Sequence, residues 1–350
     1  MNSERNAVQE QVPQMAQMAQ LATTLPEKGD PGWLLRTGRL FAEQPEQFLA
    51  LRPLPAYADL CDAAKEQCAR LQLLGLPPQA LRSGLEDIIM RDGAPAGLQW
   101  LLETGALAGF LPELHATVDF SQEAGRRHKD VWEHTKAVVR QAVPRPVVRW
   151  AAALHDIGKV TTRRFTEDGK VTFHGHSEEG VRMLRRGPVQ RIGFPPDVRE
   201  RVEVLVLHHL RPGQYDGSWT DSAVRRFHRE MEPFLGDLLD LSRADVTSKR
   251  PGKRARCLRM IKELEQRIEA LASEDARPRP LPPGLGNLLM EGLALPPGKH
   301  LAELRARLET LCEAGELEGG HDAEYYVTAV RERGLLEGLE IQPPRGLGPR

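Results

Sequence analysis

An all-α fold is predicted by three features of this 350-residue sequence. Aromatic residues are scarce, at 5%, while Ala, Leu, Arg and Glu dominate, and this composition favours helices over sheets. Apolar residues recur at helical spacing, and Pro and Gly punctuate the periodic segments. Strand-like alternation is confined to one Asp-Gly hairpin signal near the middle of the chain. We therefore expect a helical bundle that carries one small β-hairpin flap.

The overall composition restricts the possible partners and the compartment. Net charge is −1, so any contact with nucleic acid must come from a local basic patch. The four cysteines lack CxxC spacing, which argues against a zinc knuckle or a dithiol motif, and their scarcity fits a reducing compartment. No apolar run approaches the roughly 18–20 residues that span a bilayer, and the N-terminus lacks a signal pattern. We expect a cytoplasmic protein without a membrane partner.

Changes in composition along the chain predict five regions. We expect a disordered leader at 1–30 (with a marginal helix at 7–22 as the alternative), a helical neck-like region at 31–118, a central domain at 119–275, a small helical tail module at 276–340 and a flexible tail at 341–350. In the neck, prolines separate short helices, and Gly105 is a plausible helix C-cap.

The central domain holds nearly all the informative polar residues. A helix at 129–139 places His134 on the same side as Val131 and Val138, so His134 should face inward. The next helix, Trp150–Asp156, is rich in alanine and ends in His155-Asp156. We expect Gly158 to stop this helix, because glycine tolerates the left-handed cap conformation.

The rest of the domain alternates helices with turn signals. The hairpin should pair 163–166 with 170–173, and a helix should open near His176. We expect a helix at 197–209 ending in His208-His209, then one at 222–231 with Asp221 as N-cap, then one at 234–246. A basic segment, 249–256, should lead into an amphipathic helix at 258–271.

His155-Asp156 alone is best explained as a solvent-facing pair at a frayed helix end. The other polar residues change this interpretation, because each sits on or at the end of a separate predicted helix: His134, His176, His208 or His209, and Asp245. Neutral imidazoles and carboxylates that converge from several elements are typical of metal sites. Neighbouring residues on a helix point about 100° apart. His155 and Asp156 could therefore share one ion only at a helix end, and Asp156 could bridge two ions.

The order of these residues resembles the HD superfamily of metal-dependent phosphohydrolases. The matching pieces are D-V-W-E-H-T, A-L-H-D-I-G-K, F-H-G-H, V-L-H-H and L-S-R-A-D. The resemblance implies an HD-type helical bundle with one or two divalent ions at its centre. The implied first-site ligands are His134, His155, Asp156 and Asp245, and the second-site candidates are His176 with His208 or His209. Lys159 sits where the family often places a cation that contacts substrate phosphate.

A narrower resemblance covers roughly residues 50–335. The pieces L-Q-W-L-L-E-T-G-A-L, F-L-P-E-L, R-R-F-T-E-D-G-K-V-T-F, G-N-L-L-M-E-G and P-P-G-K-H-L look like the C-terminal part of bacterial tRNA CCA-adding enzymes and poly(A)-polymerase-like proteins. The nucleotidyltransferase head of that family needs an Asp-x-Asp pair for two-metal chemistry, and residues 1–120 do not supply one. Glu86-Asp87 is followed by Arg91, one position too far for the family's Glu-Asp-x-x-Arg motif. We therefore expect neck, HD body and tail without nucleotide addition.

The expected function is metal-dependent hydrolysis of a nucleotide or RNA-end phosphoester, 2′,3′-cyclic phosphates included. Asp156 and Lys159 are the expected catalytic residues. Phosphate or RNA, including tRNA, would be held by five basic residues: Lys159, Arg163, Lys249, Arg250 and Lys253. For the 249–256 run a solvated loop is an equally good interpretation. Two alternatives stay open, an RNA-binding adaptor with an idle metal site and a signalling-nucleotide phosphohydrolase. Mn, Fe, Co, Ni, Zn and Mg are not distinguished, and the oligomeric state is open.

Overall fold

The structure of the protein is a computed structural model that describes residues 32–71, 76–120, 130–167, 171–248, 250–276 and 280–341. It is mostly helical with one antiparallel hairpin, which confirms the predicted fold class. The 1–30 leader and all but the first residue of the 341–350 tail lie outside the described residues. The chain divides into two compact units, Met1–Ile268 and Glu269–Arg350. The domain boundaries expected within the first unit stay predictions.

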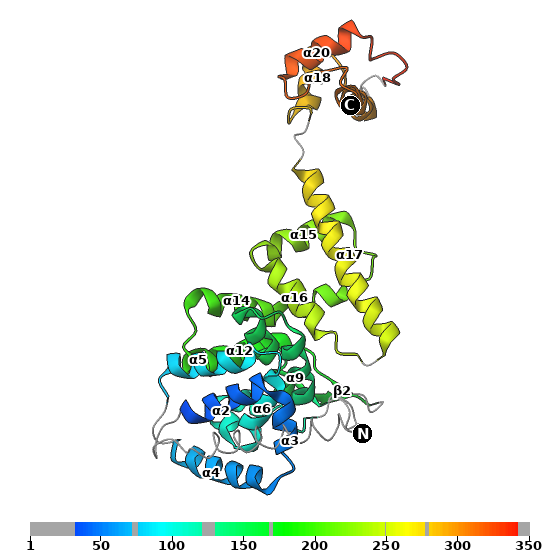
Figure 1. Ribbon diagram of the computed structural model, residues 1–350. Coiled ribbons are helices and arrows are strands. Elements are labelled where there is room, and N and C mark those ends of the chain that lie inside the picture. Colours follow the sequence, from blue (N-terminus) through cyan, green and yellow to red (C-terminus); the bar gives the residue numbers. More distant parts are fainter. Residues whose placement is uncertain are drawn as a thin grey trace, which may run out of the picture. The chain divides into compact units, whose positions relative to one another are not determined.

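Short helices build the neck, and most of them have a proline at their first or second residue. In chain order they are α2 (Gly32–Glu43), α3 (Pro45–Leu51), α4 (Pro55–Leu71), α5 (Pro78–Ile89), α6 (Ala94–Glu103), α7 (Ala106–Phe110) and α8 (Pro112–His115). Proline suits the first helical turn because the amide hydrogen it lacks would be unpaired there. Gly105 follows the C-cap of α6 with φ 75°, as predicted. Helix α2 packs against α5 and α6, next to them in Figure 1.

The central domain surrounds one helix, α10. Its helices are α9 (Val131–Gln141), α10 (Pro146–Leu154), α11 (Lys159–Thr162), α12 (His176–Arg186), α13 (Pro188–Ile192), α14 (Pro196–His208), α15 (Asp221–Met231) and α16 (Leu235–Asp245), with two 3₁₀ turns, η1 (Pro212–Gln214) and η2 (Glu232–Phe234). Helix α10 packs against α9, α14 and α16, and every residue from Val148 to Leu154 is buried. Its three alanines let these neighbours approach closely, so the end of α10 lies deep in the domain.

One hydrophobic core runs from the neck into the central domain. Two side chains of α10 join these parts. Trp150 donates its indole N–H to Glu86 Oε1 of α5 at 2.9 Å. Arg149, 1% exposed, donates to the carbonyl oxygens of Ile89 and Arg91 at 2.9 and 3.3 Å. These carbonyl groups belong to the last residue of α5 and to the turn that follows it. Helix α10 is therefore anchored to the neck by hydrogen bonds as well as by apolar contact.

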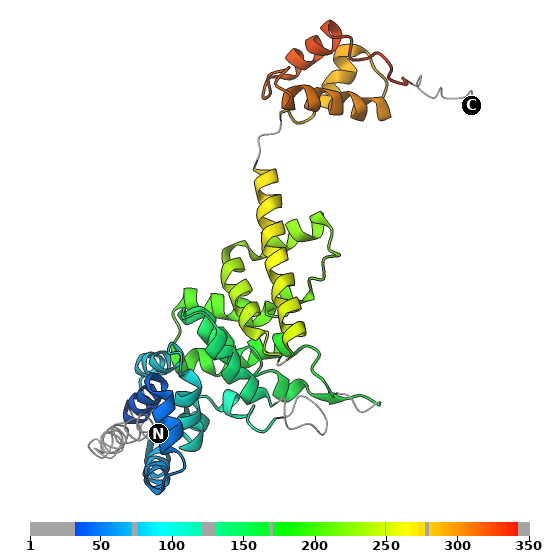
Figure 2. The ribbon, with the colours of Figure 1, turned by 45° about the vertical axis from the view of Figure 1, so that its right-hand side comes forward.

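The hairpin is shorter than predicted but correctly placed. Strands β1 (Arg164–Phe165) and β2 (Val171–Thr172) are antiparallel, with Arg164 opposite Thr172 and Phe165 opposite Val171. Turn residues 168–170 lie outside the described part of the chain. The hairpin projects from the helices of the central domain in Figure 2.

Two local predictions in the central domain were wrong in detail. Gly158 is right-handed, with φ −67°, so left-handed capping is not its role. A Cβ at this position would lie 2.1 Å from the carbonyl oxygen of His176 and 2.5 Å from the amide nitrogen of Gly180. Glycine is therefore required by close contact with α12. The N-cap of α15 is Thr220, which accepts from the Ala223 amide, and Asp221 is the first helical residue.

Helix α17 (Pro251–Asp275) is longer than the predicted helix, because the described part of the basic segment forms its first turns. In the first unit it lies alongside α15 and α16 (Figure 1). Arg243 of α16 pairs with Glu265 at 2.5 Å, and Asp221 of α15 pairs with Arg267 at 2.6 Å. These ion pairs hold α17 while leaving its basic beginning exposed.

The second unit has its own hydrophobic core. Its helices are α18 (Leu285–Leu293), α19 (Lys299–Glu313) and α20 (Ala323–Glu332). The buried Tyr326 donates its hydroxyl to the carbonyl oxygen of Pro280 at 2.7 Å. His300 is 3% exposed and packs against the turn at Gly298. Among the helices that the structure describes, none has the length and apolar character to cross a bilayer.

Candidate metal centre

Six polar side chains gather around the end of α10. They come from five places in the chain, and each lies at or near a helix end, with His134 in the first turn of α9. The six are His134, His155, Asp156, His176, His209 and Asp245. Helix α10 ends at Leu154 and gives way to a turn, in which His155 Nε2 and Asp156 Oδ2 lie 3.2 Å apart, so both side chains face the same space. Two neighbouring residues can share one ion only at a helix end, and His155 and Asp156 lie at such an end.

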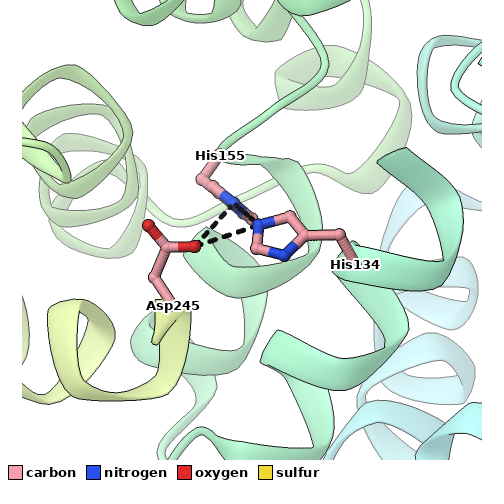
Figure 3. A group of neighbouring side chains, drawn as sticks. All are labelled: His134, His155 and Asp245. Carbon is pink, nitrogen blue, oxygen red and sulfur yellow. Dashed lines mark hydrogen bonds and ion pairs between the residues drawn. The ribbon is translucent and has the colours of Figure 1, made fainter. Parts of the chain in front are cut away.

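The first group comprises His134, His155 and Asp245, shown in Figure 3. The Nε2 atoms of the two histidines are 3.2 Å apart. Asp245 Oδ1 lies 3.0 Å from His134 Nε2 and 3.7 Å from His155 Nε2. Three potential ligand atoms therefore converge from α9, the end of α10 and the end of α16.

The second group comprises Asp156, His176 and His209, all buried. The Nε2 atoms of His176 and His209 are 3.3 Å apart. Asp156 Oδ1 lies 3.5 Å from His176 Nε2 and 4.0 Å from His209 Nε2. The start of α12 and the end of α14 thus bring their histidines to the opposite oxygen of the same aspartate.

Asp156 lies between the two groups. Its Oδ2 is 3.4 Å from His134 Nε2 and 3.2 Å from His155 Nε2, whereas its Oδ1 faces the second group. That Oδ1 is buried and has no hydrogen-bond partner. A buried charged oxygen without a partner is costly, and a cation is one of the few groups that removes the cost. The orphaned oxygen therefore fits a bound metal ion.

The outer nitrogens of the histidines fix which ring atom is available. Nδ1 of His155, His176 and His209 lies 2.8–2.9 Å from the backbone carbonyl oxygen three residues earlier. A carbonyl only accepts, so each Nδ1 carries hydrogen and Nε2 of the neutral ring presents a lone pair. Two imidazole nitrogens bound to one tetrahedral ion at about 2.0–2.1 Å would be separated by about 3.3 Å. The facing Nε2 atoms therefore have the spacing of a chelating pair.

Charge and burial make most of these groups ready to bind a cation at neutral pH. Burial lowers the pKa of His176, and burial together with the charge of His155 lowers the pKa of His209 to about 4. Burial alone would raise the pKa of Asp156, but the charges of His155 and Lys159 hold it well below its usual value. The pKa of Asp245 is lowered to about 2 against burial, through its hydrogen bond to His134.

His155 differs from the other buried histidines. Burial opposes its charged form, but the neighbouring carboxylates of Asp156 and Asp245 outweigh burial and raise its pKa. A metal ion that binds His155 must therefore displace a proton that this imidazole holds more tightly than a free imidazole does.

A cleft of about 820 Å³ adjoins the second group. It lies between β2, the beginning of α12 and the segment from the end of α14 through η1, and its lining includes Lys159, Phe173, His176, His208, Leu210 and Arg211. Lys159 Nζ is 2.7 Å from Asp156 Oδ2. Lys159 and His176 thus connect the buried cluster to a space large enough for a small organic ligand.

The other residues predicted for the site lie outside both groups. His208 lines the cleft, and there burial and the charge of Arg211 lower its pKa. Arg163 stacks over the ring of Phe120. Arg250 and Lys253 are exposed at the beginning of α17. Lys249 lies outside the described residues.

Two side chains that contribute to the site, Thr247 and Arg211, were not predicted from the sequence. Thr247 Oγ1 contacts His134 Nδ1 at 2.9 Å and so orients that ring. Arg211 lines the cleft, held by Glu230 at 2.7 Å and by the ring of Phe227. Each lies two residues after a member of the cluster, Asp245 or His209, which was the signal available in the sequence.

Comparison with known proteins agrees with this geometry. The family model described as HD domain matches residues 121–250. The A-adding tRNA nucleotidyltransferase of Deinococcus radiodurans is 29% identical over 276 residues, covering 76% of this chain and 62% of that protein. The CC-adding tRNA nucleotidyltransferase of Thermus thermophilus is 32% identical over 241 residues, covering 67% of this chain and 53% of that protein.

A third relative, the multifunctional CCA protein of Alkalilimnicola ehrlichii, is 29% identical over 190 residues, which is 52% of this chain and 43% of the relative. The matches thus span about half the length of these relatives. Residues 121–250 form an HD domain, and the chain matches the C-terminal portion of bacterial CCA-, A- and CC-adding tRNA nucleotidyltransferases over part of their length.

Proposed function

We propose that this chain is a metal-dependent phosphohydrolase that acts on a nucleotide or RNA-end phosphoester. The observation that supports this most strongly is the position of Asp156. Its carboxylate lies between two groups of His and Asp residues, and its orphaned Oδ1 is directed at the second group. The adjoining cleft, which Lys159 and His176 also line, gives a substrate access to this centre.

The proposed ligands fall into two sets that share one residue. His134, His155, Asp156 and Asp245 would hold one divalent ion, and Asp156, His176 and His209 a second. Nitrogen and oxygen donors of this kind suit Mn, Fe, Co, Ni or Zn, and Mg stays among the candidates. The metal supplies an activated water and neutralises charge on phosphoryl oxygens.

The protein's own side chains would position the phosphoester. Lys159, which now contacts Asp156 Oδ2 at 2.7 Å, would bind a non-bridging phosphoryl oxygen from the edge of the cleft. Arg211, which also lines the cleft, would bind a second oxygen through its guanidinium, which Glu230 holds in place. Asp156 would orient the attacking water through a carboxylate oxygen. His209 is the proposed ligand of the 208/209 pair, because His208 lines the cleft instead.

A second function, RNA binding without hydrolysis, is favoured by one observation. Four basic residues at the start of α17 are exposed: Arg250, Lys253, Arg254 and Arg256. Clustered Arg and Lys bind phosphates and position nucleic acid without reading its sequence. The relatives bear the names of tRNA-modifying enzymes, which supports RNA, including tRNA, as the proposed partner.

Metal analysis combined with a phosphoester panel tests the first proposal. We expect purified protein to contain a transition metal and to hydrolyse at least one nucleotide or 2′,3′-cyclic phosphate when Mn²⁺, Ni²⁺ or Mg²⁺ is added. His155→Ala and Asp156→Ala should lose both metal and hydrolysis, and His228→Ala on α15 serves as the matched control. Undiminished turnover in His155→Ala or Asp156→Ala would refute the proposal. Salt-sensitive RNA binding without hydrolysis across the panel would favour the second function.

A further inference from the structure

One face of the hairpin carries a planar cation and two aromatic rings. Phe165 stands opposite Val171 in the ladder, and the same register extended by one residue places Arg163 opposite Phe173. Side chains alternate between the two faces of a strand, so Arg163 shares a face with Phe165, and Val171 with Phe173. Val171 and Phe173 line the cleft beside the metal centre.

These side chains form a continuous series of contacts from the metal centre to the surface. Lys159, which contacts Asp156, lies 5.6 Å from the centre of the Phe173 ring. The rings of Phe173 and Phe120 are 6.3 Å apart. The Arg163 guanidinium lies 4.1 Å from the centre of the Phe120 ring and 5.4 Å from that of Phe165. Two cations and three aromatic rings thus form one series of contacts beside and on the hairpin.

The outer end of this series is open to solvent. Phe165 is 65% exposed, and Phe120 and Phe173 are half-buried, so folding uses only part of these rings. A single exposed phenylalanine needs no explanation. Here, however, the exposed Phe165 ring is the outer member of a series of contacts that begins at Lys159, a proposed catalytic residue. Nucleobases stack on aromatic rings and on arginine planes, whatever their identity.

We propose that Phe120, Arg163, Phe165 and Phe173 form a stacking track for unpaired nucleobases. The occupant is the end of a single-stranded nucleic acid, whose terminal phosphoester reaches the metal centre while the preceding bases lie along the hairpin. This inference rests on the proposed phosphohydrolase function and narrows it, because a free mononucleotide has no preceding bases to fill the track. The hairpin selects strand ends over single nucleotides.

A pair of substrates with the same terminal group tests the track. One is a short oligonucleotide ending in a 2′,3′-cyclic phosphate, and the other is the corresponding cyclic mononucleotide. Loss of one stacked base should raise KM for the oligonucleotide roughly five- to hundredfold in Phe165→Ala. The ratio of kcat/KM for oligonucleotide over mononucleotide should fall accordingly. An unchanged ratio overturns the track.

Conservative variants separate stacking from simple apolar contact. Phe165→Trp should retain the oligonucleotide preference, whereas Phe165→Leu should lose it, because leucine is apolar but has no ring. If Phe165→Leu behaves as wild type, the surface recognises apolar groups, such as those of a protein partner, and the track is refuted. Leu49→Ala on α3 is the matched control, since Leu49 is 63% exposed and lies outside the hairpin.

A binding measurement keeps the track testable apart from hydrolysis. Fluorescence anisotropy with a labelled oligonucleotide ending in a 3′-hydroxyl should show about the same loss of affinity in Phe165→Ala, with Phe165→Trp close to wild type. If the wild type hydrolyses no member of the phosphoester panel, the proposed function fails, and the anisotropy series still decides the track. Equal affinity of wild type and Phe165→Ala for the labelled strand refutes it.

Discussion

At the scale of single residues, the direction of each imidazole decides what it can do. His208 and His209 are neighbours, yet His209 donates Nδ1–H to the carbonyl oxygen of Val206 and directs Nε2 at His176, whereas His208 lines the cleft. The sequence left the choice between them open, because the helix end that separates their directions is not encoded in the spacing of two adjacent histidines.

His209→Ala should therefore lower the metal content by about one ion per chain, since it removes a proposed ligand of the second ion. His208→Ala should leave the metal content at the wild-type value and change KM or kcat instead, because His208 contacts the substrate space. Elemental analysis of both variants, side by side with the phosphoester assay, checks this. Equal metal loss in the two variants would contradict it.

Acid should remove the two proposed ions at different pH values. A raised pKa means that His155 binds a proton at higher pH than an ordinary imidazole, so a proton competes for the first site as soon as pH falls toward and below neutral. The pKa of His209 is about 4, so protons compete for the second site only in more acidic solution. Metal titrations of chelator-stripped protein at pH 8, 7, 6 and 5 should lose the His155 site first; loss of both sites together would contradict this order.

At the scale of elements, the ends of helices position the site. Helix α10 stops at Leu154, α12 begins at His176, α14 ends at His208 and α16 ends at Asp245. The turn after α10 must then fit directly under α12, and Gly158 makes this possible through the close approach of the His176 carbonyl oxygen.

Gly158→Ala should force α12 away from the end of α10 and carry His176 with it. A Cβ at 2.1 Å from a backbone oxygen cannot be accommodated by a side-chain rotation, so the backbone must shift. We expect loss of metal from the second site, with a stability loss of about 1–3 kcal/mol. Gly236→Ala in α16, where a Cβ meets open space, is the control and should bind metal as wild type does. Metal content and thermal unfolding measure both effects.

Gly158 also shows where sequence reasoning reaches its limit. The residue type correctly marked a special backbone position, but the sequence could not say whether a left-handed φ or a close neighbour required it, because the neighbour is 18–22 residues away in the chain. The helices and the hairpin, by contrast, depend on local periodicity and turn residues, and most were placed within a few residues.

At the scale of the first unit, the neck and the HD domain fold around a shared core. Arg149 is the polar part of that junction, and it also donates to the carbonyl oxygen of Val143 at 3.3 Å. No sequence pattern indicates this role, because Arg149 sits in an apolar helix and the two acceptors in the neck lie 58–60 residues earlier in the chain.

Arg149→Ala should destabilise the first unit by about 2–4 kcal/mol, because the buried carbonyl oxygen of Ile89 and the partly buried one of Arg91 lose their donor. Arg149→Lys should rescue little, since one ammonium cannot reproduce the planar fork of donors. Urea unfolding followed by tryptophan fluorescence measures the change, with the exposed Arg140→Ala as control. A midpoint for Arg149→Ala equal to that of the control would show that the junction is held by apolar contact alone.

The place of Asp156 between the two groups has a consequence for the whole centre. If one carboxylate serves both proposed ions, their occupancies are thermodynamically linked, and each ion changes the affinity of the other by the same factor. An ion at the first group must also draw Oδ2 away from the Lys159 ammonium, whereas an ion at the second group meets an Oδ1 that has no hydrogen-bond partner. Because the two sites differ in this cost and two cations on one carboxylate repel each other, binding isotherms should be biphasic, and no single dissociation constant will describe how this protein takes up metal.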